Sequence, residues 1–175
     1  MITIKTFDSQ IDRSQIESVF FETSTKKAFS SLRERENFQY KYLDFYFDHY
    51  PEMCLLLLEN DLVCGYIIGA LDSRDQGFLK QHSYYKDFLG FLNDYPAHLH
   101  INIVQSLQGQ GWGRKLLLQF EEKLKEKGIG GLHIFTDTMA VNVQFYQSCG
   151  FDFQKSHSSK SASLMFMGKS LISDS

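Results

Sequence analysis

The segment between residues 98 and 127 constrains the fold of this chain more than any other part of it. Residues 98–104, with the sequence HLHINIV, alternate polar and apolar side chains over most of their length, which is typical of a half-buried strand. A glycine-rich stretch, QGQGWGR, follows at 108–114. Residues 112–127 then carry apolar side chains at helical spacing, namely Leu117, Phe120 and Leu124. The segment predicts a strand that leads through a tight loop into an amphipathic helix.

The glycine-rich loop has the chemistry of an anion site. Gly109, Gly111 and Gly113 allow the backbone to approach a ligand closely, because no Cβ intervenes. The loop N–H groups and the dipole of the following helix converge on one point, which favours a bound anion such as pyrophosphate. A tight strand-to-helix turn without a ligand would explain the three glycines equally well.

Two widespread phosphate-binding motifs do not fit this loop. The motif GxxxxGK[ST] is absent from the sequence. The dinucleotide motif GxGxxG would need its third glycine at position 114 or 116, where the chain has Arg114 and Leu116. Spacing therefore excludes both motifs.

The remaining periodicities predict a mixed sheet with helices on both faces. Further strands are expected at 2–7, 53–59, 62–71, 131–136, 151–155 and 162–168. Further helices are expected at 10–22, 36–50 and 140–149, and the turn Glu59-Asn60-Asp61 predicts a hairpin. Residues 72–96 form a polar and aromatic insertion with a helix near 83–92. On the helix at 112–127, Glu121 and Lys125 are spaced to pair with each other.

Composition narrows the class of protein. A length of 175 residues suggests one domain covering 1–175, and 43% hydrophobic with 22% charged residues is an ordinary soluble composition. The net charge of −3 argues against nucleic-acid binding, and no apolar run approaches the roughly 20 residues that span a bilayer. The N-terminus lacks the apolar region of a signal peptide. Three sparse cysteines without a CxxC pair fit a reducing cytosol, so we expect a cytoplasmic protein in which Cys54 and Cys64 are buried thiols.

Two motifs together give a specific resemblance. Residues 108–113, QGQGWG, match the Q/R-x-x-G-x-G/A motif of the GNAT acetyltransferase superfamily, and residues 145–151, FYQSCGF, match its F-Y-x-x-x-G-F element. The hairpin before the loop and the final strands also fit, so the likeness covers nearly the whole chain. More narrowly, residues 95–101 and 108–114 resemble the acetyltransferase-like domain fused to some O-GlcNAc hydrolases, and its bacterial single-domain relatives.

The resemblance implies a mostly antiparallel sheet with a splayed central strand pair, acetyl-CoA as co-substrate, and a set of site residues. The backbone amides of the loop would bind the pyrophosphate, from Gln108 through Gly109, Gln110, Gly111, Trp112 and Gly113 to Arg114. The strand end at Ile103, Val104 and Gln105 would form a bulge, pair with pantetheine and polarise the thioester carbonyl. Tyr146 would lie near the sulfur and protonate the leaving thiolate.

Three positions depart from the pattern of many relatives. Gln105 stands where proline is common, and Met139 and Asn142 stand where the family usually has asparagine and alanine. The usual asparagine contact with pantetheine is therefore missing at 139. Asn142 lies about one helical turn further on, and two alternatives stay open: it replaces the missing asparagine contact, or the contact is lost.

The attacking amine must lose a proton, and two histidines could accept it. His98 and His100 share one face of the predicted strand with Asn102, and an ordinary histidine pKa near 6.5 suits base work at neutral pH. We expect His100 to matter more than His98; water, or histidines that only hydrogen-bond in the sheet, are the alternatives. A metal site is not expected, because no third ligand with motif spacing accompanies His98 and His100.

The resemblance implies an N-acetyltransferase that moves an acetyl group directly from acetyl-CoA to a primary amine. The acceptor is a small molecule or a peptide, with specificity expected in 36–50 and 72–96. Two alternatives stay open. One is a non-catalytic acyl-CoA sensor or interaction module on the same fold, and the other is a transferase for a longer acyl group.

Overall fold

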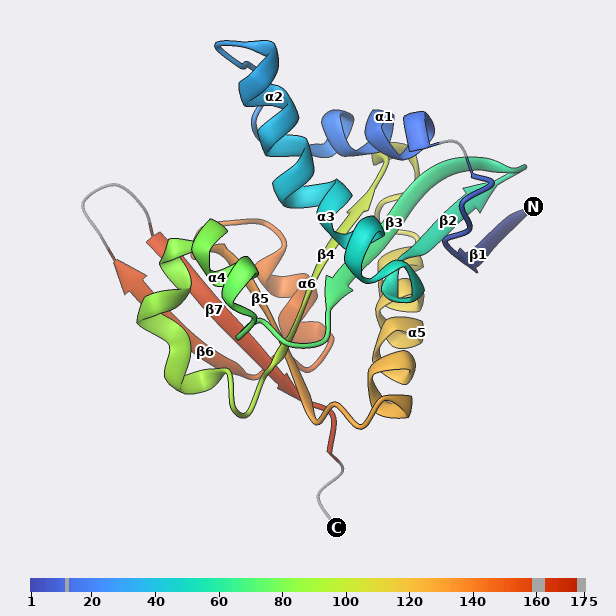
Figure 1. Ribbon diagram of the computed structural model, residues 1–175. Coiled ribbons are helices and arrows are strands. Elements are labelled where there is room, and N and C mark those ends of the chain that lie inside the picture. Colours follow the sequence, from blue (N-terminus) through green and yellow to red (C-terminus); the bar gives the residue numbers. More distant parts are fainter. Residues whose placement is uncertain (12, 159–162, 173–175) are drawn as a thin grey trace. The chain divides into compact units, whose positions relative to one another are not determined.

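The computed structural model describes residues 1–11, 13–158 and 163–172 (Figure 1). Within these residues, seven strands form one sheet in the order β1-β2-β3-β4-β5-β7-β6. The strands are β1 (Ile2–Thr6), β2 (Leu55–Glu59), β3 (Leu62–Ala70), β4 (Ala97–Ile103), β5 (Gly131–Asp137), β6 (Phe153–Ser158) and β7 (Ser163–Ser170). β4 and β5 are parallel, whereas β1–β2, β2–β3, β5–β7 and β6–β7 are antiparallel. The prediction of a mixed, mostly antiparallel sheet is confirmed.

The number and order of the helices agree with those predicted from the sequence, apart from the segments around 32–50 and 76–91. They are α1 (Arg13–Thr23), α2 (Leu32–Gln39), α3 (Phe45–His49), α4 (Gln76–Gln81), α5 (Trp112–Glu126) and α6 (Val143–Ser148). A π-helical turn at Tyr40–Asp44 joins α2 to α3. Short 3₁₀ turns lie at Pro51–Met53, Ser83–Phe91 and Gln105–Leu107.

The helix predicted at 36–50 begins earlier than expected, at Leu32. Ser31 caps it: its side chain accepts a hydrogen bond from the N–H of Glu34 at 3.1 Å. The Glu34 carboxylate in turn accepts from the N–H of Ser30 at 2.6 Å, one residue before the cap, so the arrangement is a variant of the capping box. The predicted helix at 83–92 is instead a 3₁₀ turn, and α4 before it was not predicted.

Contacts along the chain group the residues into two compact units. The first unit comprises Met1–Gly69 and His100–Phe120, and the second comprises Ala70–Leu99 and Glu121–Ser175. β4 and α5 each contribute to both units. Each unit has fully buried apolar side chains of its own, such as Leu56 in the first and Phe166 in the second.

The first unit is built around the β2–β3 hairpin. All four leucines of β2, Leu55 to Leu58, are at most 4% exposed, so both faces of the sheet are covered at this strand. Asn60 and Asp61 make the predicted turn with φ of 50° and 67°, the left-handed pair that a two-residue hairpin of type I′ requires. Cys54 precedes β2 and Cys64 lies within β3, and both are free, buried thiols, as the sequence predicts.

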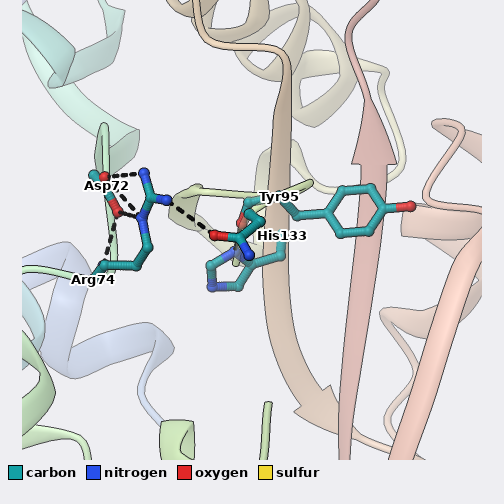
Figure 2. Close-up of polar contacts among 5 residues, drawn as sticks. Asp72, Arg74, Tyr95 and His133 are labelled. Carbon is teal, nitrogen blue, oxygen red and sulfur yellow. Dashed lines mark hydrogen bonds and ion pairs between the residues drawn. The ribbon is translucent and has the colours of Figure 1, made fainter. Parts of the chain in front are cut away.

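The second unit anchors the 72–96 insertion on β5 and β7. His133 donates from Nδ1 to the Tyr95 carbonyl at 2.6 Å (Figure 2). Its Nε2 lies 3.0 Å from the Tyr85 hydroxyl. Since a carbonyl can only accept, His133 carries a proton on Nδ1, and in the neutral imidazole the Tyr85 hydroxyl therefore donates to Nε2. Gly131 leaves no room for a Cβ, because one would collide with the Asp94 carbonyl.

One predicted ion pair is wrong. Glu121 does not pair with Lys125; it is 3% exposed, and its carboxylate accepts from Lys169 of β7 at 2.6 Å. Glu121 lies beside Phe120 and Leu124 on the buried side of α5, where a carboxylate needs a close partner. Lys125 faces solvent.

Candidate functional site

The loop after β4 has the conformation that the glycine spacing predicts. Gly109 and Gly111 adopt φ of 73° and 83°, and a Cβ built on either would meet no atom within 4 Å. These two positions therefore combine a left-handed backbone with open space beside it, which suits close approach of a ligand. The first helical hydrogen bond runs from the Lys115 N–H to the Gly111 carbonyl at 3.2 Å. The N–H groups of residues 112–114 precede it and belong to the positive end of α5.

Two glutamine side chains hold this loop in place. Gln108 donates from Nε2 to the Ile103 carbonyl at 2.8 Å, and Gln110 donates from Nε2 to the Ser106 carbonyl at 2.8 Å. Leu107, on the 3₁₀ turn between these glutamines and β4, is 6% exposed and anchors the connection. The family resemblance implies only a backbone role for both glutamines. The glutamines lie five and four residues after the carbonyls that they bind, and this spacing matches no sequence pattern that predicts a side-chain hydrogen bond.

The end of β4 is fixed on one side by β3, within the first unit. The Val104 N–H donates to the Cys64 carbonyl at 2.9 Å. A Cβ at Gly65 would approach the Asn102 carbonyl and the Ile103 side chain to 3.0 Å, so the two strands are in close contact there. β4 ends at Ile103 and Gln105 starts the 3₁₀ turn. In the second unit, β4 pairs with β5 in parallel at Ala97↔Leu132 and His98↔His133.

Trp112 and Arg114 occupy the first turn of α5. Trp112 is partly buried, and the Lys115 ammonium lies 4.0 Å from the centre of its ring. Arg114 is exposed. The first turn of α5 thus carries two cations beside the N–H groups of the loop, which adds to the positive potential there.

His100 belongs to the first unit and is held by aromatic side chains. Its Nε2 lies 3.0 Å from the hydroxyl of Tyr46, which is fully buried on α3, and the Tyr42 ring contacts it edge-on. Burial lowers the pKa of His100 from 6.5 to about 4. The imidazole is therefore neutral at physiological pH, but it titrates well below the range that an ordinary histidine pKa predicts.

His98 belongs to the second unit and is 2% exposed. Its Nδ1 lies 2.6 Å from the Ser73 hydroxyl, and its ring stacks on Phe78 at 4.4 Å. This environment matches the alternative of a histidine that only hydrogen-bonds and packs within the sheet.

Tyr146 lies on α6 in the second unit and is 5% exposed. Its ring packs edge-on against Phe145 and Phe151, both at 5.2 Å. Burial, with a smaller contribution from Cys149, raises the pKa of the Tyr146 hydroxyl above its ordinary value. The phenol therefore stays protonated at neutral pH and can donate a hydrogen bond.

The positions that depart from the family pattern lie just before α6. Met139 is 88% exposed. Asn142 is also exposed, and its Oδ1 accepts from the Thr136 hydroxyl of β5 at 2.7 Å. This contact orients the Asn142 amide nitrogen, and no sequence pattern predicts it.

Metal ligands do not gather at any point of the described residues. No group of three or more His, Cys, Asp or Glu side chains is arranged to hold a metal ion in this part of the chain. None of the helices described has the length and hydropathy needed to cross a bilayer.

Comparison with known proteins links this geometry to a family. The model of the Acetyltransferase (GNAT) family matches residues 18–151. The crystal structure of SsHAT is similar to this chain with a TM-score of 0.77 and 18% identity, covering 98% of this chain and 99% of that chain. PH1933 from Pyrococcus horikoshii OT3 is similar with a TM-score of 0.70 and 14% identity, covering 97% and 98%.

A third similar structure is yncA from Salmonella typhimurium with its cofactor acetyl-CoA. Its TM-score is 0.65 and its identity 17%, covering 100% of this chain and 96% of that chain. At such identities these structures establish a shared fold. No curated protein sequence matches the chain.

Proposed function

The chain belongs to the GNAT acetyltransferase family, whose enzymes use acetyl-CoA, and from this premise we propose that it transfers the acetyl group to a primary amine. The reaction would be a direct transfer within one N-acetyltransferase domain. The acceptor would be a small molecule or a peptide, and the narrower resemblance to the domains fused to O-GlcNAc hydrolases remains a prediction.

The loop at 108–114 is the observation that carries the proposal. Its two left-handed glycines, the open space beside them and the start of the 15-residue helix α5 fit a pyrophosphate group. Backbone N–H groups from Gln108 to Arg114 would bind the phosphate oxygens. The side chains of Gln108 and Gln110 keep the loop in this conformation before any ligand arrives.

The other residues that the family resemblance implies take the remaining binding roles in this proposal. Ile103, Val104 and Gln105 would pair with the pantetheine arm through their backbone, beyond a bulge that opens the sheet. Asn142 would replace the family's usual asparagine, and its amide nitrogen would contact the arm while Thr136 holds its oxygen.

Acetyl-CoA supplies an activated acetyl thioester when bound. The acceptor nitrogen forms the new C–N bond, the C–S bond breaks, and the amine loses one proton while the sulfur gains one. The N–H near Ile103 would stabilise the negative charge that develops on the acetyl oxygen. Neutral His100, with a pKa of about 4, would accept the proton from the nitrogen as the C–N bond forms, directly or through water, and pass it to solvent, because so weak a base does not deprotonate a free ammonium ion.

Tyr146 would act on the leaving sulfur. A phenol whose pKa is raised by burial is a weaker acid than a thiol of ordinary pKa near 8.5. Tyr146 therefore stabilises the thiolate as a hydrogen-bond donor, and the thiolate takes its proton in the end from the solvent. This is a narrower role than full protonation by the tyrosine.

A thiol-release assay tests the proposal. Purified protein is mixed with acetyl-CoA and a panel of amines, amino sugars, amino acids and peptides, and free coenzyme A is measured. We expect acceptor-dependent release with at least one class of amine. Release that is absent with every class, although acetyl-CoA binds, would favour the alternative of a non-catalytic acyl-CoA sensor.

That alternative has one specific observation in its favour. Met139 replaces the asparagine that many relatives use, and it is 88% exposed. A weakened pantetheine contact impairs an enzyme, which must hold the thioester in position for reaction. It impairs a sensor less, because a sensor only has to bind acyl-CoA. Comparing acetyl-CoA with longer acyl-CoA thioesters in the same assay also tests whether a longer acyl group is the natural one.

A further inference from the structure

A basic and aromatic cavity lies in the first unit, in the connection between α1 and α2 (blue in Figure 1). Its volume is about 510 Å³. It is lined by Phe21, Lys26, Lys27, Phe29, Ser31, Leu32 and Arg35. Three of these residues are cations and none is acidic, although the chain as a whole carries a net charge of −3.

Local partners neutralise only part of this positive charge. Lys26 pairs with Glu34 at 2.6 Å, and this contact, with the donors of Ser30, lowers the pKa of Glu34 to about 2. Lys27 donates to the carbonyls of Phe21 and Glu22 at the end of α1, which are dipoles and not full charges. One carboxylate thus offsets three cations, and the cavity keeps a positive balance.

Arg35 is the cation best placed to receive a ligand. The central carbon of its guanidinium lies 3.7 Å from the centre of the Phe21 ring, so the group rests on an aromatic face. No carboxylate of the described residues is within ion-pair distance of it. A guanidinium stacked in this way keeps its N–H donors in its own plane, where a carboxylate can accept two of them at once.

The cavity also has apolar walls. Phe21 and Phe29 meet edge-on at 6.0 Å, and Leu32 beside them is 68% exposed. A ligand with a charged end and a flat apolar body would satisfy both kinds of surface. A phosphate alone would use the cations and leave the rings without a partner.

A hydrogen bond connects this region to the end of β4. Asn102 donates from Nδ2 to the Thr23 hydroxyl at 2.6 Å, and Thr23 is the last residue of α1. The cavity begins at Phe21, two residues earlier, while Asn102 stands between His100 and Ile103 on the strand. The last turn of α1 therefore links a wall of the cavity, through Thr23, to the strand end that the proposed function assigns to the acetyl group.

We propose that this cavity binds the carboxylate of the acceptor, and that the acceptor is an amine with an apolar body and a carboxylate. The assignment to an acceptor rests on the proposed function, whereas the binding of an aryl carboxylate does not. Arg35 holds the carboxylate, Lys27 adds charge, and the phenyl rings hold the body.

The first experiment compares matched acceptors in the thiol-release assay. Phenylalanine is set against 2-phenylethylamine, and 4-(aminomethyl)benzoate against benzylamine; each pair differs by the carboxylate. In at least one pair, we expect kcat/KM to be at least about tenfold higher for the acceptor that bears the carboxylate than for the acceptor that lacks it, because charge-assisted hydrogen bonds to arginine are strong. Arg35→Gln should remove most of this ratio and Arg35→Lys part of it. Arg33→Gln, on an exposed neighbour outside the cavity, should keep it.

The second experiment needs no turnover. Binding of 3-phenylpropanoate is measured by NMR titration with the whole chain, with inorganic phosphate as competitor. We expect Arg35→Gln to weaken binding about tenfold, Arg33→Gln to leave it unchanged, and phosphate to compete poorly. Thermal unfolding of each variant verifies that α2 remains folded.

The outcomes separate the two proposals. Turnover without any carboxylate preference, or a preference that survives Arg35→Gln, would overturn the inference and leave the proposed function intact. Failure of 3-phenylpropanoate to bind, or its displacement by phosphate as readily as by another aryl carboxylate, would overturn the ligand class. Arg35-dependent binding without turnover of any amine would refute the acceptor role together with the proposed function, and leave a carboxylate site.

Discussion

Acidification should destabilise this protein through His100, and the size of the effect depends on its environment. Burial lowers its pKa from 6.5 to about 4. The unfolded chain therefore binds the proton before the folded chain does, so stability is complete above pH 6.5 and falls as the pH drops towards 4. The full difference is about 2.5 pH units, or about 3 kcal/mol, and about 2 kcal/mol of it is already lost at pH 5.

Urea unfolding of the wild type and of His100→Gln at pH 7.5 and pH 5 measures this contribution. Glutamine keeps a polar end that can reach the Tyr46 hydroxyl but does not titrate. We expect the loss of unfolding free energy between the two pH values to be about 2 kcal/mol smaller in His100→Gln, since other titrating groups are common to both proteins. Equal losses in the two proteins would refute the reasoning, because the imidazole would then titrate in the fold as it does in the unfolded chain.

Three other predictions address catalysis and packing. If His100 is the base, the acid limb of kcat should lie near pH 4 to 5 and should be absent in His100→Gln, as a pH–rate profile can show. Tyr146→Phe should lower kcat about 10²-fold with little change in acetyl-CoA affinity, and full turnover with chemistry rate-limiting would make this tyrosine a packing residue. Gly131→Ala should cost about 2 kcal/mol of unfolding free energy, because its Cβ meets the backbone of Asp94, whereas Gly90→Ala, with open space, should cost little; equal urea midpoints would contradict this.

The sheet and its hairpin could be predicted because their signals are local. The continuous leucines of β2 and the turn Asn60-Asp61 need only neighbouring residues to be interpreted, and β4, the loop and α5 follow one another without interruption. The start of α2 was also present in the sequence, as the Ser31-x-x-Glu34 capping box, but the aromatic periodicity further along outweighed it.

Other features depend on partners that are distant in sequence. Glu121 pairs with Lys169, 48 residues away in the sequence, and not with Lys125, the partner that helical spacing predicts. The lowered pKa of His100 results from burial among Tyr42 and Tyr46. The alternation of polar and apolar residues along a strand does not indicate which residues pack over that strand. The family motifs located the loop, but the side-chain contact of Gln108 arises only in the folded chain.

The central claim is that the loop at 108–114 binds the pyrophosphate of acetyl-CoA, and Gly111 offers the most direct test. Its φ is 83°, a conformation that asparagine and aspartate adopt more readily than other side chains, and its Cβ position is open. Gly111→Asn and Gly111→Asp therefore place side chains of nearly equal shape at the same point, and only the aspartate carries a negative charge.

Calorimetric titration of both variants with acetyl-CoA measures the effect of that charge. We predict that Gly111→Asp binds at least about tenfold more weakly than Gly111→Asn, which corresponds to about 1.4 kcal/mol, because its carboxylate would face the phosphates. Equal affinity of the two folded variants, close to that of the wild type, would contradict the account and place the coenzyme elsewhere.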